Sequence, residues 1–295
     1  MTDPLTALTN INLDDLVAAF GWQEQPVLSN FLRRIFCAPA RKFASQILDF
    51  DHAVQENGLP KAAQRALYHF VRDVELFGQE NLPQTGPALY LSNHPGMTDT
   101  LCLFAGIARL DLSILALDRP FLQSLPNTSR RLFYLSDNPS DRINAVKNAA
   151  KHLRGGGAVL TFPAGEIEPD PDVYNGALEA LNNWTDSAGV FLRFAPETKI
   201  VPVLVRCVLW DKAVKHPLTF LRFNHKDRER LGTSLQLLSN VIFDARPITV
   251  RVQFAKPISV AEVGSTDLAA IHAAVLERMR GLIQNPPQEK GSAVL

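Results

Sequence analysis

Apolar and polar positions divide the chain into two regions with different patterns. Over residues 11–80, apolar residues recur every three to four positions, which predicts amphipathic helices. Short breaks at Pro26, at Pro39 and at Gly58-Leu59-Pro60 separate these helices. From residue 88 onward, short apolar runs alternate with helical stretches. We therefore expect a helical region followed by alternating strands and helices.

Short apolar runs in the second region predict β-strands. They are residues 88–92, 113–116, 133–135, 158–162, 200–208 and 250–254. Helical spacing predicts helices at residues 98–110, 142–153, 177–183, 231–243 and 267–283. Strands that are mostly apolar and alternate with helices are typical of a parallel sheet covered on both faces. The pattern therefore predicts an α/β fold, with a mostly parallel sheet flanked by helices and a small N-terminal helical unit.

The same pattern predicts where these parts begin and end. Residues 78–87 contain two prolines and two glycines, which is typical of a linker. We therefore expect an N-terminal helical unit over residues 1–80 and an α/β domain over residues 81–285. Residues 286–295 follow the last predicted helix and are expected to form a flexible tail.

Composition and charge exclude several classes of protein. The 295 residues carry 30 basic and 30 acidic side chains, so the overall charge gives no reason to bind nucleic acid. The three cysteines are far apart and indicate neither a metal site nor a disulfide framework. The chain has no apolar window of about 18 residues and no signal-peptide pattern at its start. We expect a cytoplasmic protein that does not span the membrane.

The most informative motif is Asn93-His94-Pro95-Gly96-Met97-Thr98-Asp99, in which four residues separate the His from the Asp. Pro95 and Gly96 exclude a helix through its middle, so the chain should turn where the strand at 88–92 ends. This turn allows Asp99 to bind one nitrogen of the His94 ring while the other nitrogen takes a proton. The alternative is that His94 is an ordinary turn residue and Asp99 only caps the next helix.

Two further motifs follow in the chain. Phe162-Pro163-Ala164-Gly165-Glu166 comes at the end of a predicted strand, where active-site groups of α/β proteins gather. Gly165 lacks a Cβ and can let a substrate approach the backbone. Glu166 either contacts the polar head of a substrate or caps the next turn, with Glu168 and Asp170 as surface acids. The third motif is Ile200-Val201-Pro202-Val203.

These three motifs, in this order, resemble those of the glycerolipid acyltransferase superfamily, and the resemblance extends over about residues 75–285. It implies that His94 and Asp99 are catalytic. It also implies substrate-binding roles for Asn93, Arg142, Phe162, Pro163, Gly165, Glu166 and Pro202. The chain departs from the family pattern at Ala164, where a Glu is usual. It departs again at Ser136-Asp137-Asn138, where a phosphate-binding Arg is usual and Arg142 is the nearest one.

The resemblance implies transfer of a fatty acyl group to a hydroxyl of a glycerol phosphate, lysophospholipid or related acceptor. His94 would act as general base, and the donor thioester would be acyl-CoA or acyl carrier protein. We expect no metal and no further cofactor. Two alternatives are a non-catalytic lipid-binding or acyl-chain-binding relative of the fold, and a thioester or ester hydrolase that uses the same His–Asp pair.

A substrate that resides in a bilayer favours peripheral association with the inner face of the membrane. The N-terminal helices place Leu32, Phe36 and Phe43 close in sequence to Arg33, Arg34, Arg41 and Lys42. Apolar and basic residues together are typical of helices that lie on a membrane surface. The alternative is that these apolar residues pack against the α/β domain.

Overall fold

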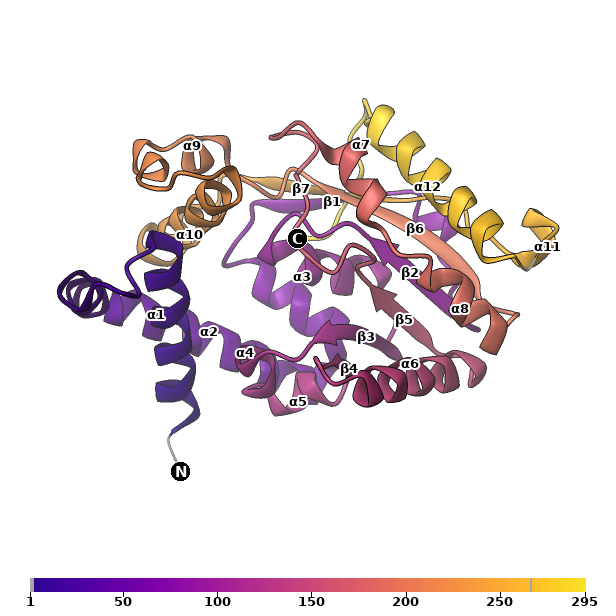
Figure 1. Cartoon of the computed structure of the whole chain (residues 1–295), viewed down its shortest axis with the longest axis horizontal. Coiled ribbons are helices and arrows are strands. Elements are labelled where there is room, and N and C mark those ends of the chain that lie inside the picture. Colours follow the sequence, from indigo (N-terminus) through magenta and orange to yellow (C-terminus); the bar gives the residue numbers. More distant parts are fainter. Residues whose placement is uncertain (1–2, 266) are drawn as a thin grey trace.

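The computed structural model describes residues 3–265 and 267–295, and a single eight-stranded sheet forms its centre (Figure 1). The order of strands across the sheet is β4-β3-β5-β2-β6-β7-β1-β8. The strands are β1 (Asp73–Phe77), β2 (Ala88–Ser92), β3 (Leu112–Leu117), β4 (Leu132–Leu135), β5 (Ala158–Thr161), β6 (Lys199–Arg206), β7 (Thr249–Phe254) and β8 (Ser292–Ala293).

The sheet is mostly parallel, as the sequence predicts. Strands β4, β3, β5, β2 and β6 are parallel neighbours, whereas β7 is antiparallel to β6 and β8 is antiparallel to β1. Leu91 of β2 lies between Thr161 of β5 and Pro202 of β6. The ends of the strands that carry the three motifs are therefore side by side, with β2 in the middle.

Helices cover both faces of the sheet, and the alternation of side chains along each strand explains why. In β2, Ala88 and Tyr90 face a core that is shared with α2 (Pro26–Leu67) and α3 (Met97–Ile107). Leu89 and Leu91 face a second core on the other side. That core is shared with α6 (Pro139–Arg154), α8 (Ser187–Phe194) and α12 (Leu268–Gln284).

A third, smaller core joins α1 (Pro4–Phe20), the first part of α2 and α10 (His225–Phe243). The other helical elements are short: η1 (Gln79–Asn81), α4 (Pro120–Gln123), α5 (Pro126–Ser129), α7 (Ala177–Ala180), η2 (Leu181–Asn183), α9 (Asp211–Val214), η3 (Pro217–Leu221) and α11 (Val260–Val263). In the part of the chain that the structure describes, no helix has both the length and the apolar character needed to cross a membrane.

The structure differs from the predicted boundaries at both ends of the α/β region. Asp73–Phe77, which we expected within the N-terminal helical unit, is strand β1 and pairs in parallel with β7. Ser292 and Ala293 lie in the expected flexible tail but pair with β1, and the Leu295 N–H donates to Asp73 Oδ1 at 3.1 Å. Both segments are too short for periodicity to separate strand from helix or tail.

The N-terminal helices also differ from the expected pattern. Pro39 lies inside α2 and does not end it, whereas Pro26 is the first helical residue. The regular helix is interrupted at Gly58, whose φ of 77° is in the left-handed region that favours glycine. The second half of α2 packs against α3, and the helical region therefore shares one core with the α/β region.

Candidate active site

His94 and Asp99 form a hydrogen-bonded pair at the end of β2. His94 Nδ1 lies 2.8 Å from Asp99 Oδ2, and Asp99 is fully buried. Because a carboxylate only accepts hydrogen bonds, the ring hydrogen lies on Nδ1. This tautomer leaves Nε2 as the nitrogen that can take a proton.

The same carboxylate also caps helix α3. Asp99 Oδ2 accepts the Gly96 N–H at 2.8 Å, and Oδ1 accepts the Thr100 hydroxyl at 2.9 Å. Gly96 comes directly before the helix and packs close to Val208, where a Cβ would lie 3.0 Å from Cγ1. The two interpretations of the motif therefore describe one arrangement, because the helix cap fixes the carboxylate that orients His94.

Phe162 brings the second motif to the His94 ring. The two rings are stacked, with centroids 4.5 Å apart and an interplanar angle of 27°. The chain then turns sharply, since the Gly165 N–H donates to the Phe162 carbonyl at 3.0 Å and Gly165 has a φ of +67°. The glycine is therefore required by the turn. No atom lies within 4 Å of the position that a Cβ would take, so this side of the turn is open.

The other predicted substrate-binding residues lie in different surroundings. Pro163 is buried, and its carbonyl accepts the Thr185 N–H at 3.2 Å. Glu166 is exposed and accepts a hydrogen bond from Lys226 Nζ at 2.9 Å. Pro202 is buried inside β6. Glu166, the last residue of the second motif, therefore has an exposed polar side chain, whereas the two prolines are buried.

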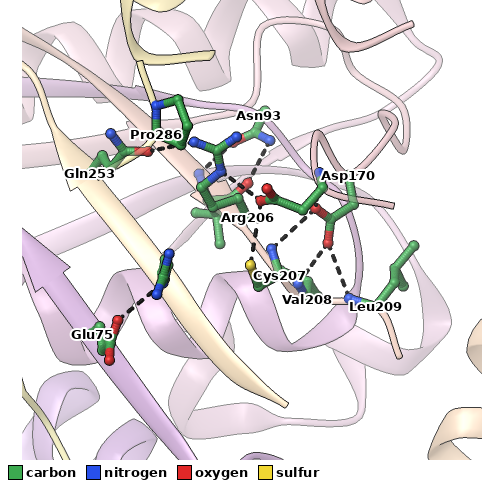
Figure 2. A network of polar contacts seen from close by, with 12 residues as sticks. Glu75, Asn93, Asp170, Arg206, Cys207, Val208, Leu209, Gln253 and Pro286 are labelled. Atoms are coloured by element: carbon green, nitrogen blue, oxygen red, sulfur yellow. Dashed lines mark hydrogen bonds and ion pairs between the residues drawn. The ribbon is translucent and has the colours of Figure 1, made fainter. Parts of the chain in front are cut away.

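Asn93 has a structural contact in place of the substrate contact that we expected. Its side chain donates to the Val205 carbonyl at 2.9 Å and accepts the Val205 N–H at 2.8 Å. Figure 2 shows this amide beside the end of β6. Asn93 is buried, so its amide extends the pairing of β2 with β6 and fixes the residue before His94.

Arg142 lies apart from this group. It is exposed in the first turn of α6, and its Nε donates to the Ser136 carbonyl at 3.0 Å. Helix α6 follows β4 at the edge of the sheet, and β3 and β5 separate that strand from β2. Among residues 3–265 and 267–295, no hydrogen bond or ion pair joins Arg142 to His94.

Two acids that we expected at the surface are buried. Glu168 accepts the His94 N–H and the Trp184 indole N–H, at 3.2 and 2.7 Å. Asp170 accepts the backbone N–H groups of Asp172, Cys207, Val208 and Leu209, and Figure 2 shows three of these contacts at the end of β6. Burial raises the pKa of Asp170, although the four N–H groups act in the opposite direction. The prolines that follow Glu168 and Asp170 disfavour a helix at both residues, but nothing in the spacing indicates that the two acids are buried.

Arg206 continues this network at the end of β6. It is buried, and its Nε donates to Asp172 at 2.6 Å while a second nitrogen donates to Gln253 at 3.3 Å (Figure 2). The segment after β5 is thus tied to β6 through Asp170 and Asp172, and to the His94 turn through Glu168. These contacts join distant parts of the chain, which is why spacing alone could not identify them.

Comparison with known proteins gives a family match for part of the chain. Residues 73–206 match the family model described as Acyltransferase, which confirms the family resemblance of the motifs. No curated protein matches the chain. A similar solved structure is that of the 1-acyl-sn-glycerophosphate (LPA) acyltransferase PlsC from Thermotoga maritima, at 15% identity and a TM-score of 0.49. The alignment covers 95% of this chain and 99% of that chain.

Asp170→Ala should lower the free energy of unfolding by about 3 kcal/mol or more, because four N–H groups, two buried and two partly buried, lose their acceptor. Urea denaturation followed by tryptophan fluorescence measures this change. Asp211→Ala is the control, since the exposed Asp211 forms an ion pair with Lys215, the exposed residue directly after α9, and should contribute less than about 1 kcal/mol. Equal losses in the two variants would contradict a structural role for Asp170.

Proposed function

We propose that this chain, whose residues 73–206 form an acyltransferase-family domain, transfers a fatty acyl group from a thioester to a hydroxyl. The donor is acyl-CoA or acyl carrier protein. The acceptor is a glycerol phosphate, a lysophospholipid or a related alcohol. The observation that carries this proposal is the pair of His94 with the buried carboxylate of Asp99, at 2.8 Å and at the carboxyl end of β2.

The geometry supports general-base catalysis. His94 Nε2 removes the proton of the acceptor hydroxyl, and Asp99 holds the ring and stabilises the imidazolium that forms. The acceptor oxygen attacks the thioester carbonyl and forms a tetrahedral intermediate. The first N–H groups of α3 are suitable donors for its oxyanion. When the intermediate collapses, the carbon–sulfur bond breaks and the thiol leaves with the proton from His94.

The ionisation of His94 fits this role. Burial favours the neutral ring, but the charge and hydrogen bond of Asp99, together with the charge of Glu168, outweigh it and raise the pKa of His94. A base with a raised pKa binds the transferred proton more strongly. Only the neutral ring can act as base. The rate of transfer should therefore rise as the pH increases through the pKa of His94, which lies above the ordinary value of 6.5.

His94→Ala should lower kcat by roughly two to four decades while the free energy of unfolding changes little, since the ring acts on a proton. Asp99→Asn should also be severe, because it changes the hydrogen bond that sets the tautomer. The assay is incubation with labelled acyl-CoA and a set of acceptors. Acylated acceptor supports transfer, free fatty acid alone indicates a hydrolase, and the absence of both indicates a binding protein. Turnover near that of the parent in purified His94→Ala would refute the assignment.

The surroundings of Arg142 favour an acceptor that does not depend on this residue for phosphate binding. Its guanidinium is already bonded to the Ser136 carbonyl, on the far side of β3 and β5 from His94. Ser136 in turn donates to Asp141 at 3.2 Å, so an acid shares the segment where the family pattern has its Arg.

Arg142→Ala should raise the KM for a phosphorylated acceptor by less than about tenfold. Loss of a charged hydrogen bond to phosphate would cost about 1.5–3 kcal/mol, which corresponds to a larger change in KM. Lys147→Ala, on an exposed position of the same helix, is the control. Initial rates are compared with a phosphorylated acceptor and its uncharged analogue. A larger loss that is confined to the phosphorylated acceptor would restore Arg142 as the phosphate ligand.

Membrane association is also part of the proposal, but by a different face of α2 from the one expected. Leu32 and Phe43 are buried and Phe36 packs on the third core, so these residues face inward. Val27 and Phe31 lie on the outward face and are 81% and 58% exposed. Ile35 and the exposed Arg34 and Arg41 continue this face, since helical spacing places them within one stripe.

A second exposed apolar group lies next to this stripe. Phe220 and Phe223 are 68% and 99% exposed on the segment that leads into α10. The Arg222 guanidinium lies against Gly21, which places this segment beside the turn between α1 and α2. Lys226 then connects the start of α10 to Glu166 of the second motif. Apolar side chains with arginines beside the site fit the surface of an anionic bilayer.

Phe31→Ser combined with Phe223→Ser should reduce sedimentation of the protein with vesicles of phosphatidylcholine and phosphatidylglycerol. Binding of the parent should weaken as salt is added, because part of the attraction is electrostatic. Phe194→Ser is the matched control, since Phe194 is 48% exposed at the end of α8, on the opposite side of the molecule in Figure 1. Equal sedimentation of all three proteins would exclude this surface.

A further inference from the structure

Glu168 and His94 are hydrogen-bonded to each other in both directions. The Glu168 N–H donates to the His94 carbonyl at 3.0 Å, and the His94 N–H donates to Glu168 Oε2 at 3.2 Å. The main chain of His94 is therefore fixed on both sides by one residue of the segment that follows β5. The position of the ring depends on this main chain, because His94 follows the end of β2 and both its N–H and its carbonyl are bonded to Glu168.

The second oxygen of Glu168 is occupied as well. Oε1 accepts the Trp184 indole N–H at 2.7 Å, and Glu168 and Trp184 are only 5% and 4% exposed. Two N–H donors bind the two oxygens, and a carboxylate can accept both. Glu168 therefore does not replace the substrate-binding Glu that the family pattern has at the position of Ala164, because both of its oxygens are already bonded. Its contacts are directed at His94.

The charged groups that face Glu168 are His94 on the turn and Asp99 on α3. Burial raises the pKa of Glu168 to about 7, although the bonds from Trp184 and His94 and the charge of His94 oppose this. Asp99 acts in the same direction as burial. Two carboxyl groups thus act on the charge of the ring, and the charge of Glu168 favours the imidazolium form of His94.

We propose that Glu168 is a positioning residue for His94, which holds the turn that carries the ring and stabilises the imidazolium when His94 takes the acceptor proton. This inference rests on the proposed general-base role of His94. Loss of the carboxylate should then affect kcat more than KM, because the imidazolium forms only as the reaction proceeds. Glu168 acts through His94 and touches no reacting atom.

The test is Glu168→Gln, which preserves the size of the side chain but removes its charge and one acceptor. We expect kcat at pH 8 to fall by about tenfold to a hundredfold with KM nearly unchanged, as is typical when a catalytic group is misplaced. The inflexion of the kcat/KM profile and the NMR titration of the His94 ring should both move to lower pH. His94→Ala identifies the ring signal. Glu179→Gln, an exposed Glu on α7, is the control and should change neither quantity.

The NMR titration needs no acyl transfer, so it separates this inference from the proposed function. If the protein has no transferase activity but the His94 titration moves in Glu168→Gln, the coupling stands and the function is wrong. If kcat falls while the titration stays in place, Glu168 is only structural and the proposal is overturned. Unchanged kcat and titration would overturn it as well.

Trp184→Phe provides a second route if Glu168→Gln does not fold. This variant keeps an aromatic ring and the charge of Glu168 but removes one donor, so the pKa of Glu168 should rise further. The carboxyl then ionises at higher pH, and the apparent pKa of His94 near neutral pH should fall. A His94 titration identical to that of the parent would contradict the proposal.

Discussion

The arrangement of the site depends on one carboxylate that has two functions. Asp99 is buried, accepts the N–H group that begins α3 and holds the His94 ring at the same time. A buried carboxylate is unfavourable unless its oxygens are bonded, and here the helix cap supplies that compensation. The orientation of the His94 ring is therefore coupled to the formation of a helix. Any change that disturbs the start of α3 also moves the ring.

The segment after β5 follows the same physical rule. It carries Glu168, Asp170 and Asp172, and the first two of these acids are buried, with one proline between them. Each buried carboxyl group has N–H donors from a different part of the chain, namely the His94 turn, Trp184 and the end of β6. These bonds join the segment after β5 to the His94 turn, to Trp184 and to the end of β6. Burial would otherwise neutralise the acids and leave the segment without a fixed path.

The sequence predicts the central part of this structure well. Strand β2 and the strands beside it have apolar runs bounded by Gly and Pro, and the turn after β2 follows from Pro95 and Gly96. Strand β1 was missed because Val74 and Leu76 also continue the helical spacing of the preceding residues. The roles of Asn93, Glu168 and Asp170 could not be predicted. Their partners, such as Val205 and Trp184, lie far away in sequence, and only folding brings them within hydrogen-bonding distance.

The reversal of direction between β6 and β7 makes the two ends of the strands unequal. Five parallel strands have their carboxyl ends on the side of the sheet that holds His94, whereas β7 and β1 have theirs on the opposite side. The connection after β7 returns to the start of β6, where Ile258 pairs with Ile200. Gly264, a few residues later, is exposed and has open space around it. The side of the sheet near Gly264 is consequently the place where a fluorophore, an affinity tag or a fused domain can be attached away from His94.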